Sequence, residues 1–134
     1  MHPVITLGVP LMDADHATVE AMFERVETTA DADLPSLFAE IEAEVIAHFG
    51  REEALMDEAG APVAHCHKTQ HALLLSEFAR ARPAADTDGT DLRRTLAQLA
   101  EFVAGHVASV DRVTAQFLGG NLDTAQVDRL RLPE

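Results

Sequence analysis

The sequence predicts an all-α fold, an up-down-up-down antiparallel four-helix bundle. Apolar residues recur at intervals of three and four in four separate segments, which is the spacing of one face of a helix. Short stretches with Pro, Gly and Asp separate these segments, and no stretch alternates strictly between apolar and polar residues as a half-buried strand does. We therefore expect a single domain over residues 1–134, with helices at about 14–29, 35–58, 63–82 and 91–118, a short N-terminal arm and a C-terminal tail.

The first two helices are bounded by recognisable start and stop residues. Asp13 is expected to cap the first helix, which would run to about Thr29. Pro35 suits the first turn of the second helix, and residues 60–62 (Gly-Ala-Pro) would end it. The expected inner face of the first helix carries His16, Val19, Phe23 and Val26. That of the second carries Leu34, Phe38, Ile41, Val45, His48, Glu52 and Leu55.

The third and fourth helices follow the same pattern. The third should stop near Pro83, before a loop rich in Asp and Thr at 84–89. The fourth should end at residues 119–121 (Gly-Gly-Asn), with a short extra turn in the tail beyond. The inner face of the third helix carries His67, His71, Leu74 and Phe78. That of the fourth is an unbroken stripe of Leu92, Leu96, Leu99, Val103, His106, Val110, Val113 and Phe117.

Composition excludes several classes of protein. The net charge of −13 argues against nucleic acid and anionic membranes as partners, because both favour clustered Lys and Arg. No apolar run approaches the length that crosses a bilayer, and the first residues lack the basic region of a secretion signal. The single cysteine, Cys66, excludes an internal disulfide and fits a reducing cytoplasm. We expect a cytoplasmic protein without membrane insertion.

Ionisable residues occupy positions on the helix faces where a hydrophobic residue belongs. His48 and Glu52 lie in the second stripe and His106 in the fourth, while histidines open the first and third stripes. Burying one such group unpaired costs several kcal/mol, so five or six in a small domain must be paired with each other or bind a metal. Seven histidines in a chain without Trp or Tyr add to the case for metal.

The spacing of these residues supports metal binding. His48 and Glu52 are four residues apart, as are His67 and His71, so each pair projects from one helix face. His106 and Asp111 are five apart, about 140° on a regular helix. Both could still reach one centre from its flanks, or a π-type turn could bring them together.

Four motifs in this order resemble the bacterial branch of the hemerythrin family. The first is Gly8-Val9 followed by residues 12–16 (Met-Asp-Ala-Asp-His), and the second is residues 48–56 (His-Phe-Gly-Arg-Glu-Glu-Ala-Leu-Met). Residues 67–71 (His-Lys-Thr-Gln-His) and 106–111 (His-Val-Ala-Ser-Val-Asp) match the third and fourth. The resemblance spans roughly residues 8–117. It implies a hemerythrin-like domain that binds dioxygen at a non-haem di-iron centre.

The resemblance also implies a role for each ligand. One iron would be held by His67, His71 and His106, and the other by His16 and His48. Glu52 and Asp111 would bridge both irons, together with an oxo or hydroxo group. With about six positions per iron, one position stays open on the iron with two histidines, where dioxygen would bind. The family's oxygen pocket falls on Val19, Phe49, Phe102, Val103 and Val107, and Phe102 stands where relatives often carry Trp.

The leading interpretation is reversible dioxygen binding for oxygen transport, storage or buffering, rather than enzyme activity. Five imidazoles and only two carboxylates stabilise highly oxidised iron less than the carboxylate-rich sites of di-iron oxidases do. An oxygen or redox sensor, or a di-iron oxidase or peroxide-handling enzyme, is the alternative. Zinc hydrolysis is a weaker alternative, because Lys68 stands where the zincin motif needs Glu.

Cys66 is expected to be a small buried hydrophobe, and His2 and His65 to lie at the surface. The oxygen-accepting partner stays unknown.

Overall fold

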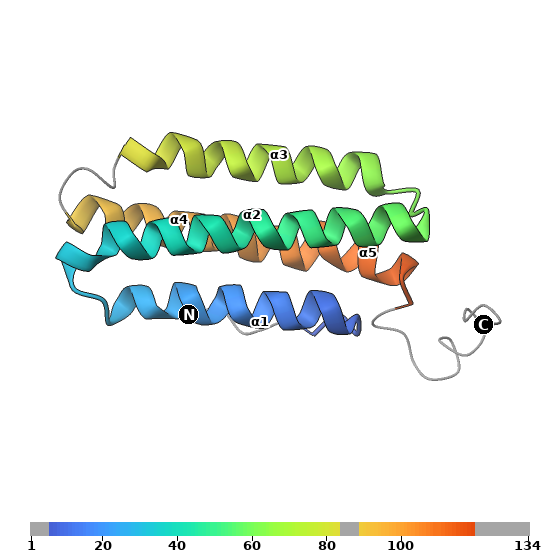
Figure 1. Ribbon diagram of the computed structural model, residues 1–134, viewed down its shortest axis with the longest axis horizontal. Helices are drawn as coiled ribbons and strands as arrows, with labels where there is room; N and C mark the ends of the chain where they lie inside the picture. The colour runs from blue at the N-terminus through green and yellow to red at the C-terminus, as the bar shows by residue number, and fades with distance from the viewer. Residues whose placement is uncertain (1–5, 84–88, 120–134) are drawn as a thin grey trace.

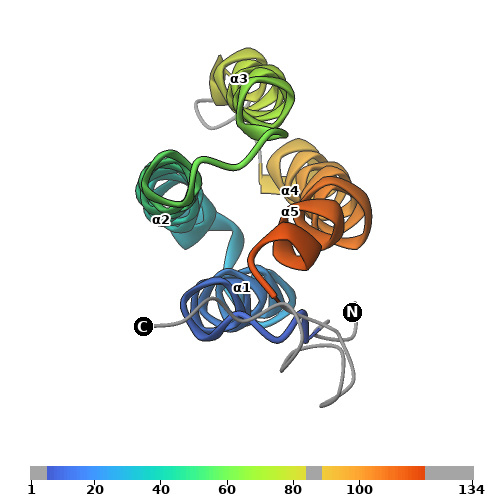
Figure 2. The same cartoon turned by 90° about the vertical axis from the view of Figure 1, so that its right-hand side faces the viewer.

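The computed structural model describes residues 6–83 and 89–119, which form four antiparallel helical columns (Figure 1). The first column is α1 (Pro10–Glu24) with the 3-10 turn η1 (Arg25–Glu27), and the turn η2 (Asp31–Asp33) leads into α2 (Leu34–Ala59). The third is α3 (Ala64–Ala81). The fourth comprises α4 (Gly89–His106), a π-helical turn η4 (Val107–Asp111) and α5 (Arg112–Phe117). Seen end-on, each column occupies one corner of a bundle (Figure 2), and the described residues contain no strand. The predicted four-helix fold is confirmed.

The start of α1 differs from the prediction. The helix begins at Pro10, which suits a first helical position, and Asp13 therefore lies inside the helix rather than at its cap. The Asp13 carboxylate instead accepts hydrogen bonds from the backbone N–H groups of Leu7, at 2.7 Å, and Gly8, at 3.0 Å. These bonds fasten the segment that precedes the helix. The column also ends earlier than Thr29, although Val26 in η1 is buried as expected.

The end of α2 follows the expected turn chemistry. Gly60 has φ +64°, a left-handed conformation that glycine adopts without a Cβ penalty. The backbone N–H of Ala61 then donates to the carbonyl of Met56 at 3.0 Å. Met56 is fully buried in the last turn, whereas Leu55, expected on the inner face, is only partly buried.

The fourth column departs from the predicted stripe after His106. A π-helical turn holds about one residue more than an α-helical turn, so every later residue is rotated by about 100° from its expected position. Val113 and Phe117 are consequently 46% and 56% exposed, and Thr114 and Ala115 are buried in their place. The expectation of an unbroken stripe as far as Phe117 is therefore wrong.

The apolar core is divided into two clusters. The smaller one gathers Leu7, Val9, Met12, Val107 and Ala115 at the start of α1 and the end of the fourth column. The larger one fills the other end of the bundle and comprises Val19, Phe23, Val26, Leu34, Leu37, Phe38, Ile41, Val45, Phe49, Leu74, Phe78, Leu92, Leu96 and Leu99. His16, between Met12 and Val19 on α1, marks the level at which polar residues separate the clusters.

None of the helices in the described residues is long and apolar enough for a membrane span. Residues 1–5 of the expected N-terminal arm, the surface position of His2, the 84–89 loop up to residue 88 and the tail's extra turn lie outside the described residues.

Candidate metal centre

Seven ionisable side chains from all four columns meet inside the bundle. They are His16 from α1, His48 and Glu52 from α2, His67 and His71 from α3, His106 at the end of α4 and Asp111 at the end of η4. All seven are buried, and the most exposed of them retain only 6% of their surface. The sequence-predicted ligand residues are thus brought together in one place.

The seven residues form two groups that share the two carboxylates. One group holds Glu52, His67, His71, His106 and Asp111. The other holds His16, His48, Glu52 and Asp111. Within each group, one potential ligand atom per residue lies within 4.8 Å of all the others. The arrangement offers two neighbouring cation positions, one with a ligand fewer than the other.

Each carboxylate divides its two oxygens between the groups. Oδ1 of Asp111 lies 2.8 Å from Nε2 of His67 and 2.9 Å from Nε2 of His106, whereas Oδ2 lies 2.9 Å from Nε2 of His16. Glu52 repeats the pattern: Oε1 faces Nε2 of His71 at 3.0 Å, and Oε2 faces Nε2 of His48 at 2.9 Å. Both carboxylates therefore have the geometry of bridging ligands.

These separations fit metal coordination better than hydrogen bonding. Ligand atoms on adjacent corners of an octahedron with bonds of about 2.1 Å lie about 3.0 Å apart. Both Asp111 oxygens, although within 2.9 Å of imidazole nitrogens, are buried and make no properly directed hydrogen bond. Nε2 of His67 also lies 3.2 Å from Nε2 of His106, close to the separation of two neighbouring ligand atoms on one cation. The donor set fits a pair of metal ions.

The π-helical turn η4 brings Asp111 to the centre. It lies between His106 and Asp111, which are both buried and whose ligand atoms are 2.9 Å apart. Of the two sequence-based alternatives for this pair, the structure has the π-type turn.

Further side chains fix the outward nitrogens of three histidines. Nδ1 of His48 donates to the Asp15 carboxylate at 3.1 Å, and Nδ1 of His71 donates to Glu53 at 2.9 Å. Nδ1 of His67 is hydrogen-bonded to the hydroxyl of Thr114. Such bonds set the tautomer and turn Nε2 inward, towards a metal.

Sequence reasoning missed these three partners. An acidic residue directly beside a ligand in the chain was the available signal for Asp15 and Glu53. Asp15 is also bound by the Arg51 guanidinium, at 2.8 Å through Nε and 3.0 Å through Nη2. Burial would raise the pKa of Asp15, but the hydrogen bonds from Arg51 and His48 lower it. Asp15 therefore stays ionised beside His48.

Electrostatics at the centre favour cations. With protons as the only cations present, burial would lower the pKa of His16, but Asp111 and Glu52 outweigh burial and raise it to about 9. The same carboxylates raise the pKa of His67 to about 9 against the effect of its burial. Burial would raise the pKa of both carboxyls, yet close contacts with the surrounding histidines hold each pKa well below its usual range. At neutral pH the carboxylates are ionised and attract positive charge.

A family model described as "Hemerythrin HHE cation binding domain" matches residues 7–118. The chain belongs to the hemerythrin family. A bacteriohemerythrin from Ralstonia nicotianae (strain ATCC BAA-1114 / GMI1000) is 35% identical over 114 residues, which cover 84% of this chain and 82% of the relative. A bacteriohemerythrin from Stenotrophomonas maltophilia (strain R551-3) is 26% identical over 125 residues, covering 89% and 80%. No solved structure gives a significant match. The predicted family is confirmed, and its cation-binding description agrees with the buried cluster.

The expected oxygen-pocket residues of this hemerythrin-family chain lie in different environments. Val19, Phe49 and Val107 are buried, and the partly buried Val103 packs against both apolar clusters. The Phe49 ring stacks on the His71 ring with centroids 3.8 Å apart. Phe102 is 48% exposed and lines a surface groove between α3 and α4, so the structure does not bring it to the buried cluster of ligand residues.

Cys66 is exposed, contrary to the expectation of a small buried hydrophobe. Because the adjacent His67 points into the centre, the position about 100° round α3 faces outward. The thiol lines an apolar groove of about 490 Å³ between the start of α3 and η4. His65, two residues before His67, is exposed as predicted. Lys68, directly after His67, forms an ion pair in which its Nζ lies 2.8 Å from Oδ1 of Asp57.

Proposed function

We propose that the chain binds two iron ions between its helices and binds dioxygen there reversibly. The observation that supports this proposal is the way in which the two oxygens of each carboxylate face different groups of histidines. Glu52 and Asp111 each direct one oxygen at a group of three imidazoles and the other at a group of two. Two metal ions that share both carboxylates account for this division, whereas a single ion in either group would leave the imidazoles of the other group without a ligand role.

The proposed ligands follow the two groups. His67, His71 and His106 would hold one ion and His16 and His48 the other, and Glu52 and Asp111 would serve both ions, which an oxo or hydroxo group would also join. Imidazole and carboxylate ligands suit iron. The iron pair, when bound, supplies the two electrons that reversible dioxygen binding requires.

The chain's own residues favour binding at the side of His16 and His48. That group has one ligand fewer, so it leaves a position for dioxygen. The buried apolar side chains of Val19, Phe49 and Val107 keep water and proton donors away, which favours release of dioxygen over its reduction. We infer a role in oxygen transport, storage or buffering rather than in catalysis, and the chain lacks the Tyr and Trp side chains that usually relay radicals in di-iron oxidases.

Cycling the iron-loaded protein between dioxygen and vacuum tests this function. The reduced protein should be colourless, gain a charge-transfer band in the visible–near-ultraviolet on exposure to dioxygen, and lose it again under vacuum over several cycles. Steady consumption of dioxygen with an added reductant would replace binding by oxidase or peroxide-handling activity.

A further inference from the structure

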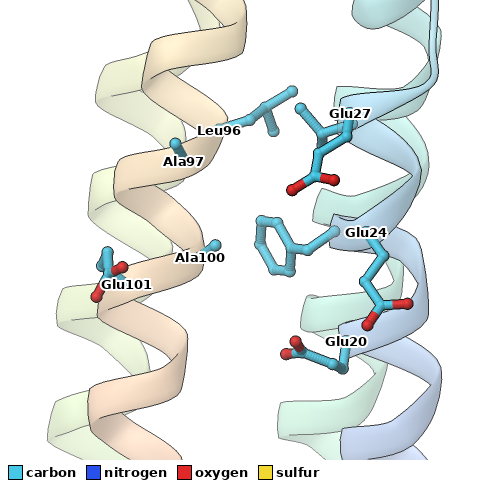
Figure 3. A pocket seen from close by; sticks show the side chains of 9 residues that line it. Glu20, Glu24, Glu27, Leu96, Ala97, Ala100 and Glu101 are labelled. Carbon is cyan, nitrogen blue, oxygen red and sulfur yellow. The ribbon is translucent and has the colours of Figure 1, made fainter. Parts of the chain in front are cut away.

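The carboxylates along the first column differ in how they are neutralised. Glu20 and Glu24 of α1 and Glu27 of η1 line a surface hollow beside α4 (Figure 3). Among the residues that the structure describes, none of these three glutamates forms an ion pair with a basic side chain. Asp15 of the same column is instead bound by the guanidinium of Arg51 from α2. This ion pair lies next to the metal centre.

Arg51 binds the Asp15 carboxylate at two points. Its Nε donates to Oδ2 of Asp15 at 2.8 Å, and its Nη2 donates to Oδ1 at 3.0 Å. Nη2 also donates to Oε1 of Glu44, seven residues earlier on α2, at 2.8 Å. Two parallel hydrogen bonds between a guanidinium and a carboxylate restrict the orientation of both groups. Glu44 therefore helps to hold Arg51, and Arg51 fixes the orientation of the Asp15 carboxylate.

The fixed carboxylate lies against a proposed ligand. Oδ2 of Asp15, which accepts from Nε of Arg51, also accepts from Nδ1 of His48 at 3.1 Å. On the other side of the imidazole ring, Nε2 of His48 lies 2.9 Å from Oε2 of Glu52. The side chain of Arg51 is 41% exposed, that of Asp15 is 14% exposed and that of His48 is 4% exposed. Guanidinium, carboxylate and imidazole thus form a continuous path from the surface to the centre.

The orienting carboxylate in the other group has no such support. Nδ1 of His71 donates to Oε2 of Glu53 at 2.9 Å. Within residues 6–83 and 89–119, no Lys or Arg side chain forms an ion pair with Glu53, and the nearby Lys68 pairs with Asp57. Support from a guanidinium is therefore specific to the carboxylate beside His48.

The group of two imidazoles depends on this one contact. Nδ1 of His16 is buried and has no hydrogen-bond partner in the described part of the chain. In the group of three imidazoles, both His67 and His71 have partners at Nδ1. A hydrogen bond at the outward nitrogen fixes the tautomer and the ring orientation of a ligand histidine. In the smaller group, only His48 is fixed in this way.

We propose that Arg51 is a positioning residue for the ion assigned to His16 and His48. Arg51 acts through Asp15, whose carboxylate it holds against Nδ1 of His48. Without the guanidinium, this partly exposed carboxylate is free to turn towards water, and the His48 ring loses its fixed orientation. The inference rests on the proposed two-ion centre and adds that a surface residue supports one ion of the pair, the one with the open position.

Stepwise binding of Zn²⁺ to the full chain tests this role without dioxygen. Zn²⁺ accepts imidazole and carboxylate ligands and is redox-inactive, so competition with a chromophoric chelator reports the affinity for each of the two ions. Asp15→Ala removes the hydrogen bond to His48 and should weaken the binding of one ion about tenfold. Arg51→Gln should weaken the same ion about fivefold and leave the other unchanged, and Arg51→Lys should recover part of the loss.

A double-mutant cycle shows whether Arg51 acts through Asp15. If it does, Arg51→Gln should cause no further loss of Zn²⁺ affinity in a chain that already carries Asp15→Ala. The matched control is Arg25→Gln. Arg25 pairs with Glu40 at 3.5 Å, so this substitution also removes one positive charge from an ion pair between the first column and α2. Both Zn²⁺ affinities should be unchanged in the control.

Nuclear magnetic resonance of the Zn²⁺-loaded chain with isotope-labelled histidine reports the hydrogen bond itself. In Arg51→Gln, the Nδ1 proton of His48 should exchange with water faster, and that of His71 should not. Additive losses in the cycle, equal weakening of both ions, an equal loss in Arg25→Gln or an unchanged His48 proton would each overturn the role of Arg51 and leave the two-ion centre intact. A single Zn²⁺ bound by the unaltered chain would overturn the two-ion centre, and this inference with it.

Discussion

Metal binding should displace protons from the centre, and the number of protons can be worked out from the structure. The pKa of His16 and that of His67 are both about 9 when no metal competes. At pH 7, a group with such a pKa is roughly 99% protonated. A metal ion binds only the neutral imidazole, so loading both positions should release about two protons per chain from these two residues. His48, whose pKa is raised by Glu52 against the effect of burial, adds to that number.

The same competition sets the pH dependence of affinity. At a pH two units below the pKa of an imidazole, removing its proton reduces the free energy of metal binding by about 2.7 kcal/mol. For the pair His16 and His67 the reduction is about 5 kcal/mol. The combined affinity for two ions should therefore rise about a hundredfold between pH 7 and pH 8. The carboxyls contribute little, because they are already ionised.

Anaerobic calorimetry with Fe²⁺ in two buffers of different ionisation enthalpy counts the released protons. His16→Gln should remove about one proton from the count at pH 7, and His65→Gln at an exposed site should leave it unchanged. Release of no protons at pH 7, or an affinity that does not change with pH, would refute the assignment of these imidazoles to the metal.

Four other outcomes follow from the same contacts. His16→Ala should abolish the dioxygen spectrum while retaining much of the iron, because the group of three imidazoles is intact; iron analysis and absorbance measure both. Thr114→Val removes the hydrogen bond to His67 and should lower metal affinity about tenfold in a competition titration. Phe78→Ala, at a fully buried position beside Phe38, should cost about 3–5 kcal/mol in the free energy of unfolding measured with denaturant. In the metal-free protein, the raised histidine pKa values stabilise the fold fully below pH 6.5, and this contribution is lost as the pH rises through about 9, which thermal melts at several pH values would detect.

Each of these outcomes has a clear opposite. Equal loss of both irons in His16→Ala would contradict the two-group arrangement. Unchanged affinity in Thr114→Val would remove the positioning role of its hydroxyl. A cost below about 1 kcal/mol for Phe78→Ala would be inconsistent with a rigid core at that point. A metal-free protein that melts at a higher temperature at pH 9.5 than at pH 6 would show that imidazolium–carboxylate pairs do not stabilise it.

Helix periodicity was sufficient to predict the bundle and to draw attention to the buried ionisable residues. A histidine within an apolar stripe breaks a strong local rule, so its burial beside a partner could be inferred at His48 and His106. Both are 6% exposed or less. The family motifs then supplied the pairing of ligands.

Periodicity was insufficient where one extra residue in a helical turn, or a side chain from a neighbouring helix, decided which residues are buried or bonded. Nothing in the spacing distinguishes a π-type turn from a flanking approach, so the exposure of Val113 and Phe117 was not foreseen. Asp15 of α1 contacts His48 of α2, and the spacing of residues along a single helix cannot predict a contact between two helices. Phe102 is apolar, but its side of α4 faces solvent beside α3.

Dioxygen uptake measured by manometry, with iron analysis on the same anaerobically reduced sample, tests the central proposal most directly. We predict two irons per chain and one dioxygen taken up for each pair of irons, with the gas recovered under vacuum. One iron per chain, or uptake that continues beyond this ratio without recovery, would contradict reversible binding at a di-iron centre.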